Sequence, residues 1–422
     1  MLKKIAVTLL SNGYAQFVAV SVFLLTARFY GVEGRGIYAS ATAAWTFGAS
    51  LLGFSIGTVL PYFVVSASDG RERFFRERLV SLVVLVLALS FFAGAAICGL
   101  HTLYPALRGK VPLSHLAAVG VSFPYYMWMG SNDLVFSSAG EIVRQNRITF
   151  FNRTAFLLAS AAAIAVLHAS LFSFLILYGA FNLLQMTSEI WFLARRFRVE
   201  FVVDTKFIWA VIGKGLSVHA VTIAALLNTS FSILVLTYYS RDLKDVGYFN
   251  FVAQLTSMLM LLPIVVNRYL MSEITAHGAR EVWPKQKRIM LFCLLTMCAI
   301  CVVAAVLIEP FCRLFKSDFV GAVTLFRMIL IVVVPSAFCT LMQSQWYSSG
   351  LFKLMSITNV GVGVLSAVVT LLTVPRFHEF GAATTTIVTF SALFVINLVF
   401  YFRLDREQRG PLLTVEVAPP RT

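Results

Sequence analysis

Apolar segments of about 20 residues recur along the whole chain, and this feature limits the possible folds most strongly. The first segment runs from Ile5 to Phe29 and is too long for the core of a cleavable signal peptide. Only 13% of the 422 residues are charged, and the mean hydropathy is +0.84, whereas a soluble domain carries about 25% charged residues. We therefore expect a multi-pass, all-α membrane protein, because helices satisfy their own backbone hydrogen bonds within lipid.

The apolar segments predict about twelve transmembrane helices joined by short connections. We place them at residues 5–29, 37–65, 79–103, 114–138, 149–168, 171–194, 216–239, 247–270, 289–309, 320–345, 354–374 and 381–402. Residues 404–422 contain no such segment, and we expect them to form a disordered cytoplasmic tail.

The distribution of positive charge predicts the orientation of the chain. Of the 34 Lys and Arg residues, 24 lie on the amino-terminal side of the expected helices and nine on the opposite side. Connections rich in Lys and Arg remain in the cytoplasm, so we expect both termini there. The net charge of +15 is spread between spans and not gathered on one face, which argues against nucleic acid as a partner.

A weak internal repeat divides the chain into two halves. Three pairs of residues stand 211 or 210 positions apart, namely Gly36 and Gly247, Pro124 and Pro335, and Gly140 and Gly350. Because six spans separate the copies, both halves cross the membrane in the same direction and form a parallel repeat. We predict two six-helix bundles, residues 1–206 and 207–403, with a cavity between them.

Motifs for metal, nucleotide or enzyme chemistry are absent or lack the context they need. Cys298 and Cys301 form a C-x-x-C within an apolar helix and have no second pair, so we expect them to pack as small apolar residues. The glycines of "GVEGRG" (31–36) are flanked by membrane helices instead of the strand and helix of a nucleotide loop. We expect no metal, no cofactor and no catalytic site.

Arginines dominate the charged residues that we place within or beside the spans. They are Arg28 at the end of the first span, Arg35 in the turn that follows it, Arg153 near the start of the fifth span and Arg327 inside the tenth. Burial in hydrocarbon is unfavourable enough to suggest function, although Arg327 has the alternative of snorkelling or pairing with an acid. Because the planar guanidinium matches phosphate groups, we expect an anionic substrate.

Polar side chains inside the spans supply further candidates. Asn132 and Asp133 lie in the fourth span, and Asn132 corresponds to Gln343 at the 211-residue offset. They form a shared cavity wall or, as an equal alternative, hydrogen bonds between helices. Asn12 and Gln16 share one face of the first span and either bind sugar hydroxyls or pack against another helix.

Two acids and a turn complete the candidates. Asp133 and Glu189 are the acids that we place inside spans, and Glu189 is expected to snorkel towards the cytoplasmic surface. In the turn "RFYGVEGRGIYA" (28–39) the glycines permit close packing. Arg35 is expected at the rim beside Glu33, whereas Arg28 is expected to reach the cavity.

Several motifs together resemble one family of membrane transporters. They are "ARFYGVEGRGIYA" after the first span, "DVGYF" in the second half, "SSAGEIVRQNRITFFN" (137–152) and "WYSSGLFKLMSITN" (346–359). With them the chain resembles the Wzx-type O-antigen and lipid-linked oligosaccharide flippases of the MATE-like multidrug/oligosaccharidyl-lipid/polysaccharide superfamily. The resemblance covers nearly the whole chain, and Arg28 matches the arginine that ends the first span in that family.

The resemblance implies two six-helix lobes that alternate between inward-open and outward-open states. The substrate would be an oligosaccharide linked to undecaprenyl diphosphate, moved across the bacterial inner membrane for polysaccharide biosynthesis. Its lipid tail would remain in the bilayer at a gap between the lobes, and membrane lipids, a polymerase and export proteins are the expected partners. Replacing Arg28 or Arg327 by Ala is expected to weaken transport.

Three alternatives remain open. A MATE-type, ion-coupled cation antiporter shares the fold but is expected to carry an acid in the first span, and this chain has none there. A membrane enzyme that polymerises or ligates lipid-linked sugars is expected to have a large outer loop, whereas these connections are short. A membrane scaffold without transport activity is the third.

Overall fold

The computed structural model describes residues 2–65, 70–103, 109–228 and 230–409, and these ranges form helices and no strand. The helices are α1 (Leu2–Leu52), α2 (Ile56–Val65), α3 (Gly70–Leu103), α5 (Leu113–Gly120), α6 (Phe123–Ala139), α7 (Ile142–Ala161), η1 (Ala162–Val166), α8 (Leu171–Phe197), α9 (Thr205–Leu216), α10 (His219–Asn228), α11 (Ser230–Tyr239), α12 (Lys244–Leu259), α13 (Leu261–His277), α14 (Ala279–Phe315), η2 (Ser317–Gly321), α15 (Ala322–Leu330), α16 (Val333–Ser348) and α17 (Phe352–Arg409). The all-α prediction is confirmed.

Six of the described helices are long and apolar enough to cross a membrane, and nine spans result if each of three bent helix pairs counts as one. Part of the difference from twelve arises because α1 and α17 each contain two of the expected spans. The chain is therefore a multi-pass membrane protein. Residues 404–409, which we expected in the tail, belong to α17, and residues 410–422 lie outside the described part of the chain.

Both α1 and α17 contain a reversal of the chain. In α1, Gly31 has φ 70° and ψ −168°, a backbone conformation that glycine adopts without a steric penalty. The Arg35 side chain donates a hydrogen bond back to the Thr26 hydroxyl at 3.0 Å. In α17 the reversal occurs at His378, which has φ 49°. The turn expected within residues 28–39 therefore forms at Gly31.

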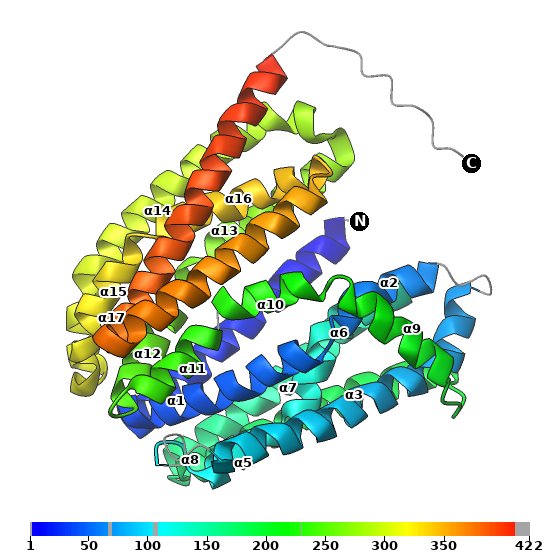
Figure 1. The fold of residues 1–422 in the computed structure, drawn as a ribbon, viewed down its shortest axis with the longest axis horizontal. Coiled ribbons are helices and arrows are strands. Elements are labelled where there is room, and N and C mark those ends of the chain that lie inside the picture. Colours follow the sequence, from blue (N-terminus) through cyan, green and yellow to red (C-terminus); the bar gives the residue numbers. More distant parts are fainter. Residues whose placement is uncertain (1, 66–69, 104–108, 229, 410–422) are drawn as a thin grey trace.

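The helices form two groups that diverge from one end like the arms of a V (Figure 1). The first arm contains α2, α3, α5 to α8 and the second part of α1, and the second arm contains α12 to α17. Between them α10 and α11 pack against α17, whereas α9 packs against α2 and α3. We call the two ends of the V the closed end and the open end; α1 begins and α17 finishes at the open end.

A close contact between the halves, the seam, closes the V and follows the sequence repeat. A Cβ atom on Gly36 would lie well under 3.0 Å from the carbonyl oxygen of Leu243, and one on Gly247 equally close to that of Val32. Both the glycines and their partners stand 211 residues apart. The two contacts are therefore related by the repeat, and only glycine permits so close an approach of the backbones.

The repeat extends to the helices of the fourth and tenth spans. Helix α6 has a proline in its first turn and ends at Gly140, with φ 75°. Helix α16 has Pro335 near its start and is followed by Gly350, with φ 67°. A left-handed glycine is a common helix terminator, so both copies begin and end by the same local chemistry.

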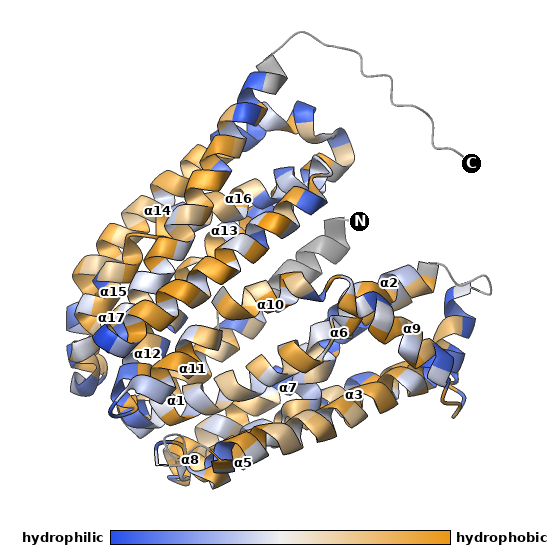
Figure 2. Cartoon of the chain, viewed as in Figure 1, coloured by the Kyte–Doolittle hydropathy of each residue, from blue (hydrophilic) through white to orange (hydrophobic). Residues whose placement is uncertain are grey.

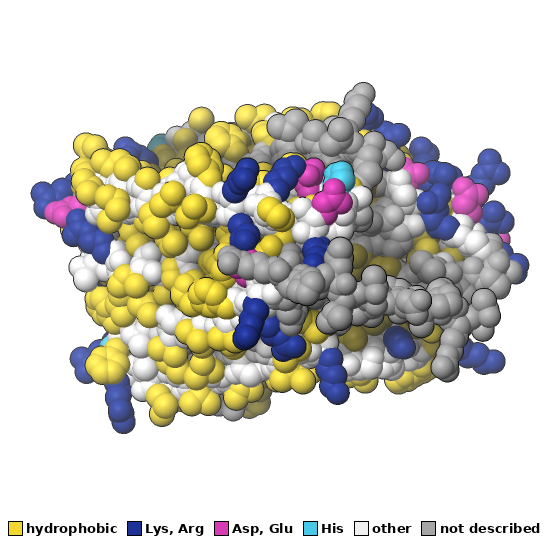
Figure 3. All heavy atoms as spheres, turned by 90° about the horizontal axis from the view of Figure 1, so that it is seen from above, with side chains coloured by type: hydrophobic (Ala, Val, Ile, Leu, Met, Phe, Trp, Pro, Cys, Tyr) yellow, Lys and Arg dark blue, Asp and Glu magenta, His cyan; other side chains and the backbone are white. Residues whose placement is uncertain are grey.

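Apolar side chains cover the outside of both arms. Phe91, Phe92 and Phe292 are each at least 70% exposed, as expected for a surface solvated by lipid. Hydrophobic residues dominate the long helices, and hydrophilic residues are frequent towards their ends (Figure 2). In Figure 3 hydrophobic side chains cover much of the left part of the face, and charged side chains gather at its left end and over its right half.

Candidate functional site

The interior of the first arm contains two arginines among tyrosines, which we call the Arg–Tyr cluster. Its members are Arg35 and Tyr38 on α1, Tyr125 and Tyr126 on α6, Arg153 on α7 and Tyr178 on α8. The Tyr126 and Tyr178 hydroxyls lie 2.9 Å apart, and the Tyr38 and Tyr178 rings meet edge to face at 5.7 Å. Tertiary packing of four helices therefore brings together residues that are distant in sequence.

Arg35 lies inside this cluster and not at a rim. Its side chain is only 4% exposed, and its guanidinium carbon lies 4.5 Å from the centre of the Phe23 ring. It donates hydrogen bonds to Thr26 and, across the seam, to the Asn250 side-chain oxygen at 2.5 Å. The expected position beside Glu33 is wrong because the reversal at Gly31 returns the chain to the interior before residue 35.

Arg153 provides the second positive charge of the cluster. Its side chain donates a hydrogen bond to the Tyr125 hydroxyl at 3.3 Å. Neither Arg153 nor Arg35 forms an ion pair with any acid in the described part of the chain. Two guanidinium groups held among neutral partners at low dielectric create a strongly positive potential, which favours an anion.

Glu189 on α8 lies at the centre of a second polar network in the first arm. The carboxylate accepts hydrogen bonds from Trp128 at 2.7 Å, from Asn132 at 3.1 Å and from Gln185 at 2.8 Å. The side chain of Glu189 is fully buried, so our expectation that it snorkels is wrong. Its donors are neutral because α6 and α8 face each other here and supply amide and indole N–H groups.

The three polar candidates of the fourth and tenth spans occupy different environments. Asn132 is 5% exposed and joins α6 to α8 through Glu189, which corresponds to the alternative of interhelical hydrogen bonding. Asp133 is exposed and accepts a hydrogen bond from Gln145 at 2.7 Å. Gln343 lines a pocket in the second arm. The 211-residue offset therefore predicted equivalent positions but not equivalent surroundings.

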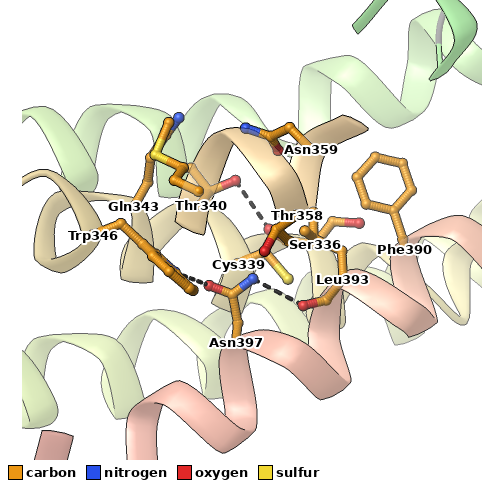
Figure 4. Close-up of a pocket in the computed structure, with 11 residues that line it drawn as sticks. Ser336, Cys339, Thr340, Gln343, Trp346, Thr358, Asn359, Phe390, Leu393 and Asn397 are labelled. Carbon is orange, nitrogen blue, oxygen red and sulfur yellow. Dashed lines mark hydrogen bonds between the residues drawn. The ribbon is translucent and has the colours of Figure 1, made fainter. Parts of the chain in front are cut away.

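The pocket beside Gln343 lies between α16 and the two parts of α17 and has a volume of about 150 Å³. Its wall contains amides, hydroxyls and two aromatic rings and no ionisable group except the Cys339 thiol (Figure 4). Asn397 is held in place, because it accepts a hydrogen bond from Trp346 and donates one to the Leu393 carbonyl. This pocket is polar and uncharged, in contrast to the Arg–Tyr cluster.

Arg28 and Arg327 lie outside both of these sites. Arg28 donates a hydrogen bond to the Phe315 carbonyl at 3.0 Å, and its own carbonyl accepts one from Lys316, so it connects the two arms at the closed end. Arg327 is exposed, and its guanidinium pairs with Glu309 on α14 at 3.4 Å. This contact corresponds to the ion-pair alternative.

The candidates on the first span contribute little to the described geometry. Gln16 is exposed, and no described residue forms a hydrogen bond with its side chain. The side chain of Asn12 lies outside the described part of the structure. Cys298 and Cys301 are free, and no cluster of His, Cys, Asp and Glu suited to a metal ion occurs among the described residues.

An apolar pocket of about 480 Å³ lies at the boundary between the two arms. It is lined by residues of α1, α3 and α5 from the first arm, of α11 between the arms, and of α17 from the second arm. Lys110 lies near this boundary and donates hydrogen bonds to the Thr237 and Tyr238 carbonyls. The pocket therefore joins both arms at the closed end.

Three acids near the two ends of the V have shifted pKa values, and the direction of the shift differs between them. At the closed end, burial raises the pKa of the Asp245 carboxyl and of the Glu379 carboxyl. At the open end, the hydrogen bond from Lys285 lowers the pKa of the Glu273 carboxyl. The ionised form is therefore disfavoured at Asp245 and Glu379 and favoured at Glu273.

The sequence analysis placed Arg35 at the rim and missed the tyrosines of the cluster. A signal for the tyrosines was present, since Tyr125 and Tyr126 directly follow Pro124 at the start of a helix that the repeat had already identified. For Arg35 the signal was its distance of four residues from Gly31, one helical turn beyond the reversal. Neither signal specified which helices would surround these side chains.

Solved structures of membrane transporters share this fold. The lipid II flippase MurJ, in an inward closed conformation, matches with a TM-score of 0.73 and 12% identity over 93% of this chain and 87% of that one. An inward-facing multidrug resistance MATE family transporter of the MOP superfamily matches with a TM-score of 0.67 and 12% identity, over 94% of this chain and 96% of that one. An outward-facing MATE family transporter matches with a TM-score of 0.55 and 14% identity, over 96% of this chain and 97% of that one.

No protein-family model matches the sequence, and no curated protein matches it. The three solved structures are transporters or flippases by name and not enzymes. At such low identity they establish the architecture and leave the cargo open. The chain therefore shares the fold of these transporters, with two helical arms that meet at one end.

Proposed function

We propose that the protein is a flippase that moves a lipid-linked oligosaccharide across the cytoplasmic membrane of a bacterium by alternating access. The supporting observation is the pair of arginines in the Arg–Tyr cluster: Arg35 is buried, Arg153 is half-buried, and neither has an acidic partner among the described residues. Placing charge in such an environment is unfavourable by several kcal/mol, so the presence of these arginines suggests a function. A diphosphate supplies two acceptor groups that match guanidinium donors.

The open end of the V faces the cytoplasm in this proposal. The excess of Lys and Arg on the side of the termini supports that orientation. The likeness to inward-facing or inward-closed transporters, which is greater than that to the outward-facing one, agrees with a state closed towards the outside. The substrate would enter between the arms from the cytoplasmic leaflet, and its release would require the seam to separate.

The hydrogen bond from Arg35 to Asn250 links the separation of the seam to the hydrogen bonding of the Arg35 guanidinium group. In the closed seam the Asn250 carbonyl oxygen occupies one guanidinium N–H group. The Arg35 Nε–H has no hydrogen-bond partner among the described residues and is available to a substrate phosphate while the seam is closed. The apolar pocket between the arms offers a surface for the hydrocarbon tail, which would remain outside the polar interior.

The test compares arginine variants in vesicles that contain the purified protein and a polyprenyl diphosphate-linked oligosaccharide. We expect Arg35→Gln and Arg153→Gln each to reduce flipping by about tenfold or more, equivalent to about 1.4 kcal/mol, because each removes one phosphate-binding fork. Arg327→Ala is the matched control, since that side chain is exposed and already paired with Glu309. Its expected effect on stability is below about 1 kcal/mol.

Two results would contradict the proposal. One is a wild-type protein that moves no lipid-linked sugar under conditions in which a known flippase does. The other is flipping at the wild-type rate by both glutamine variants, with normal insertion shown by their yield and thermal melting. Lys variants separate charge from shape, because Lys keeps the charge but loses the planar fork.

A second candidate, ion-coupled export of cations, is favoured by one observation. Glu189 is a fully buried carboxylate with three neutral donors and no basic partner among the described residues. Such a group is able to bind and release a proton during transport. Proton-dependent efflux of a cationic dye that is abolished by Glu189→Gln would favour this candidate over the flippase.

A further inference from the structure

The uncharged pocket in the second arm has a composition that indicates its ligand. Figure 4 shows Trp346 and Phe390 towards opposite ends of the pocket, with Gln343, Thr340, Thr358 and Asn359 between them. The volume of about 150 Å³ equals that of about five water molecules in the liquid. This space is on the scale of one sugar ring and is too small for a longer glycan.

Several polar groups on the pocket wall are available for a ligand. No described residue forms a hydrogen bond with the side chains of Thr358 and Asn359, and the Gln343 amide has only a long contact of 3.5 Å to Tyr347. Asn397 by contrast is occupied by Trp346 and Leu393. The free groups include two amides, each of which both donates and accepts.

The same wall excludes other classes of ligand. A charged group would find no counter-charge among the lining residues, so its desolvation would be uncompensated. A hydrocarbon chain would displace water from the Gln343 and Asn359 amides without replacing its hydrogen bonds, which is unfavourable. A neutral ring with several hydroxyls satisfies the amides and presents its C–H groups to the aromatic rings.

We propose that this pocket binds one sugar ring of the transported head group. This inference rests on the proposed flippase function, and it assigns the two ends of the head group to different arms. The diphosphate binds the Arg–Tyr cluster of the first arm, and the sugar binds the pocket of α16 and α17 in the second. Because a substrate held by both arms bridges them, it also favours the joint movement of the arms that alternating access needs.

The experiment measures binding of two probes to the purified full-length protein, a polyprenyl diphosphate carrying one hexose and the same lipid without the sugar. We expect the wild type to bind the glycosylated probe at least about tenfold more tightly, because only that probe fills the pocket and forms hydrogen bonds with its amides. Gln343→Met and Asn359→Leu keep the approximate side-chain volume and remove the amide. Each is expected to reduce the preference several-fold, and the double variant to bring it within about twofold of unity.

Thr358→Val and Thr384→Val provide a matched pair on α17. The Thr358 side chain lines the pocket, whereas that of Thr384 is exposed and donates a hydrogen bond to the Phe380 carbonyl of its own helix. We expect only Thr358→Val to lower affinity for the glycosylated probe. Affinity for the lipid without sugar serves as the folding control for all variants, because the diphosphate site lies in the other arm.

The outcomes distinguish this inference from the proposed function. If the wild type binds both probes equally, or if the double amide variant keeps the full preference, the sugar pocket is overturned and the diphosphate site stands. If the wild type binds neither probe, the proposed flippase function fails and the pocket assignment fails with it. Loss of the preference with unchanged affinity for the unglycosylated lipid supports the assignment.

Discussion

The two arms are copies in architecture and differ in the chemistry of their interiors. In the first arm the Trp128 indole of α6 donates to the Glu189 carboxylate of the last helix at 2.7 Å. In the second the Trp346 indole of α16 donates to the neutral Asn397 amide of α17 at 2.8 Å. A tryptophan bridge therefore serves the packing of both arms, and packing alone does not require the charge of the first.

The arginines are a second difference between the interiors of the two arms. Arg35 and Arg153 lie inside the first arm, whereas the described buried polar side chains of the second arm are amides and hydroxyls, such as Gln286 and Gln345. Duplication thus preserved the helix packing and allowed the interiors to diverge. This divergence is what makes different substrate parts plausible ligands for the two arms, and three predictions test it.

The largest effect is expected where the arms are equivalent, at the glycine seam. Gly36→Ala and Gly247→Ala each place a methyl group against a backbone carbonyl of the other arm, and overpacking of this kind destabilises by about 1–3 kcal/mol. We expect both to lower transport by about tenfold or more. Ser40, which contacts Thr237 across the seam, is expected to become reactive from outside when replaced by Cys in these backgrounds.

The control for the seam is Gly361→Ala, since no atom lies within 4 Å of the added methyl group. It is expected to transport normally. Labelling at Ser40→Cys is measured by the mass of its peptide, because the chain has six cysteines of its own. Unchanged transport and unchanged labelling in both alanine variants would show that the seam does not depend on glycine. A strong effect in only one would break the equivalence of the arms.

An intermediate effect is expected from removing the acceptors of the two tryptophan bridges. Glu189→Ala leaves the donors of Trp128, Asn132 and Gln185 unpaired, while Asn397→Ala leaves the single donor of Trp346. Each unpaired buried group is unfavourable by about 1–3 kcal/mol. We therefore expect Glu189→Ala to lower the free energy of unfolding by about 3 kcal/mol or more, and Asn397→Ala to lower it by about 1–2 kcal/mol.

The measurement is thermal or denaturant unfolding of the two purified variants in the same detergent. Glu189→Gln supplies the control, because it keeps one acceptor oxygen and is expected to fall between wild type and Glu189→Ala. Equal destabilisation by the two alanine variants would mean that the carboxylate contributes no more to packing than the amide does. The contrast between the arms would then rest on the arginines alone.

The smallest effect is expected from the acid at the closed end. Burial raises the pKa of Asp245, Asp242 adds to that rise, and His378 and Lys110 oppose it. A raised pKa means that the folded protein holds this proton more tightly than the unfolded chain. Asp245 therefore destabilises the fold above its raised pKa, and this effect disappears as the pH falls through that value towards the ordinary carboxyl range.

We accordingly expect Asp245→Asn to raise the melting temperature by about 2 °C or less at neutral pH and to differ less from wild type as the pH falls. Glu273→Gln is the control from the open end, where the pKa is lowered by Lys285 and the sign is opposite. Melting curves between neutral and acidic pH provide the measurement. If the difference in melting temperature between Asp245→Asn and wild type widened as the pH falls, the assigned direction of the pKa shift would be wrong.

The architecture could be predicted from the sequence because its signals are local and strong. Apolar length and the glycine and proline offsets predicted an all-helical membrane protein with a repeat, and α6 and α16 show that repeat in their boundaries. The candidate site could be predicted only in part. Arg153 and Gln343 do face the cluster and the pocket, whereas Arg28 and Arg327 bond to other residues at the surface or the closed end.

Charge and depth in a span identify residues that need a partner, but they do not identify the partner. Arg327 has Glu309 because α14 and α15 are neighbours, and the two residues are 18 positions apart. Arg35 has Asn250 because the halves meet at a seam 215 positions away in sequence. The sequence analysis named both arginines but expected Arg35 at the rim, whereas the structure buries Arg35 and exposes Arg327.

Hydrophobicity by itself determined that this chain crosses a membrane as helices, since continuous apolar segments of about 20 residues have the length of a membrane-spanning helix and a helix satisfies its own backbone hydrogen bonds in lipid. The spacing of glycines and prolines determined that it does so in two similar halves. Only the tertiary structure decided which polar side chains lie inside, because a turn at Gly31 and the contact of Gly36 with Leu243 set the facing of α1. Those contacts are long-range, and no local pattern records them.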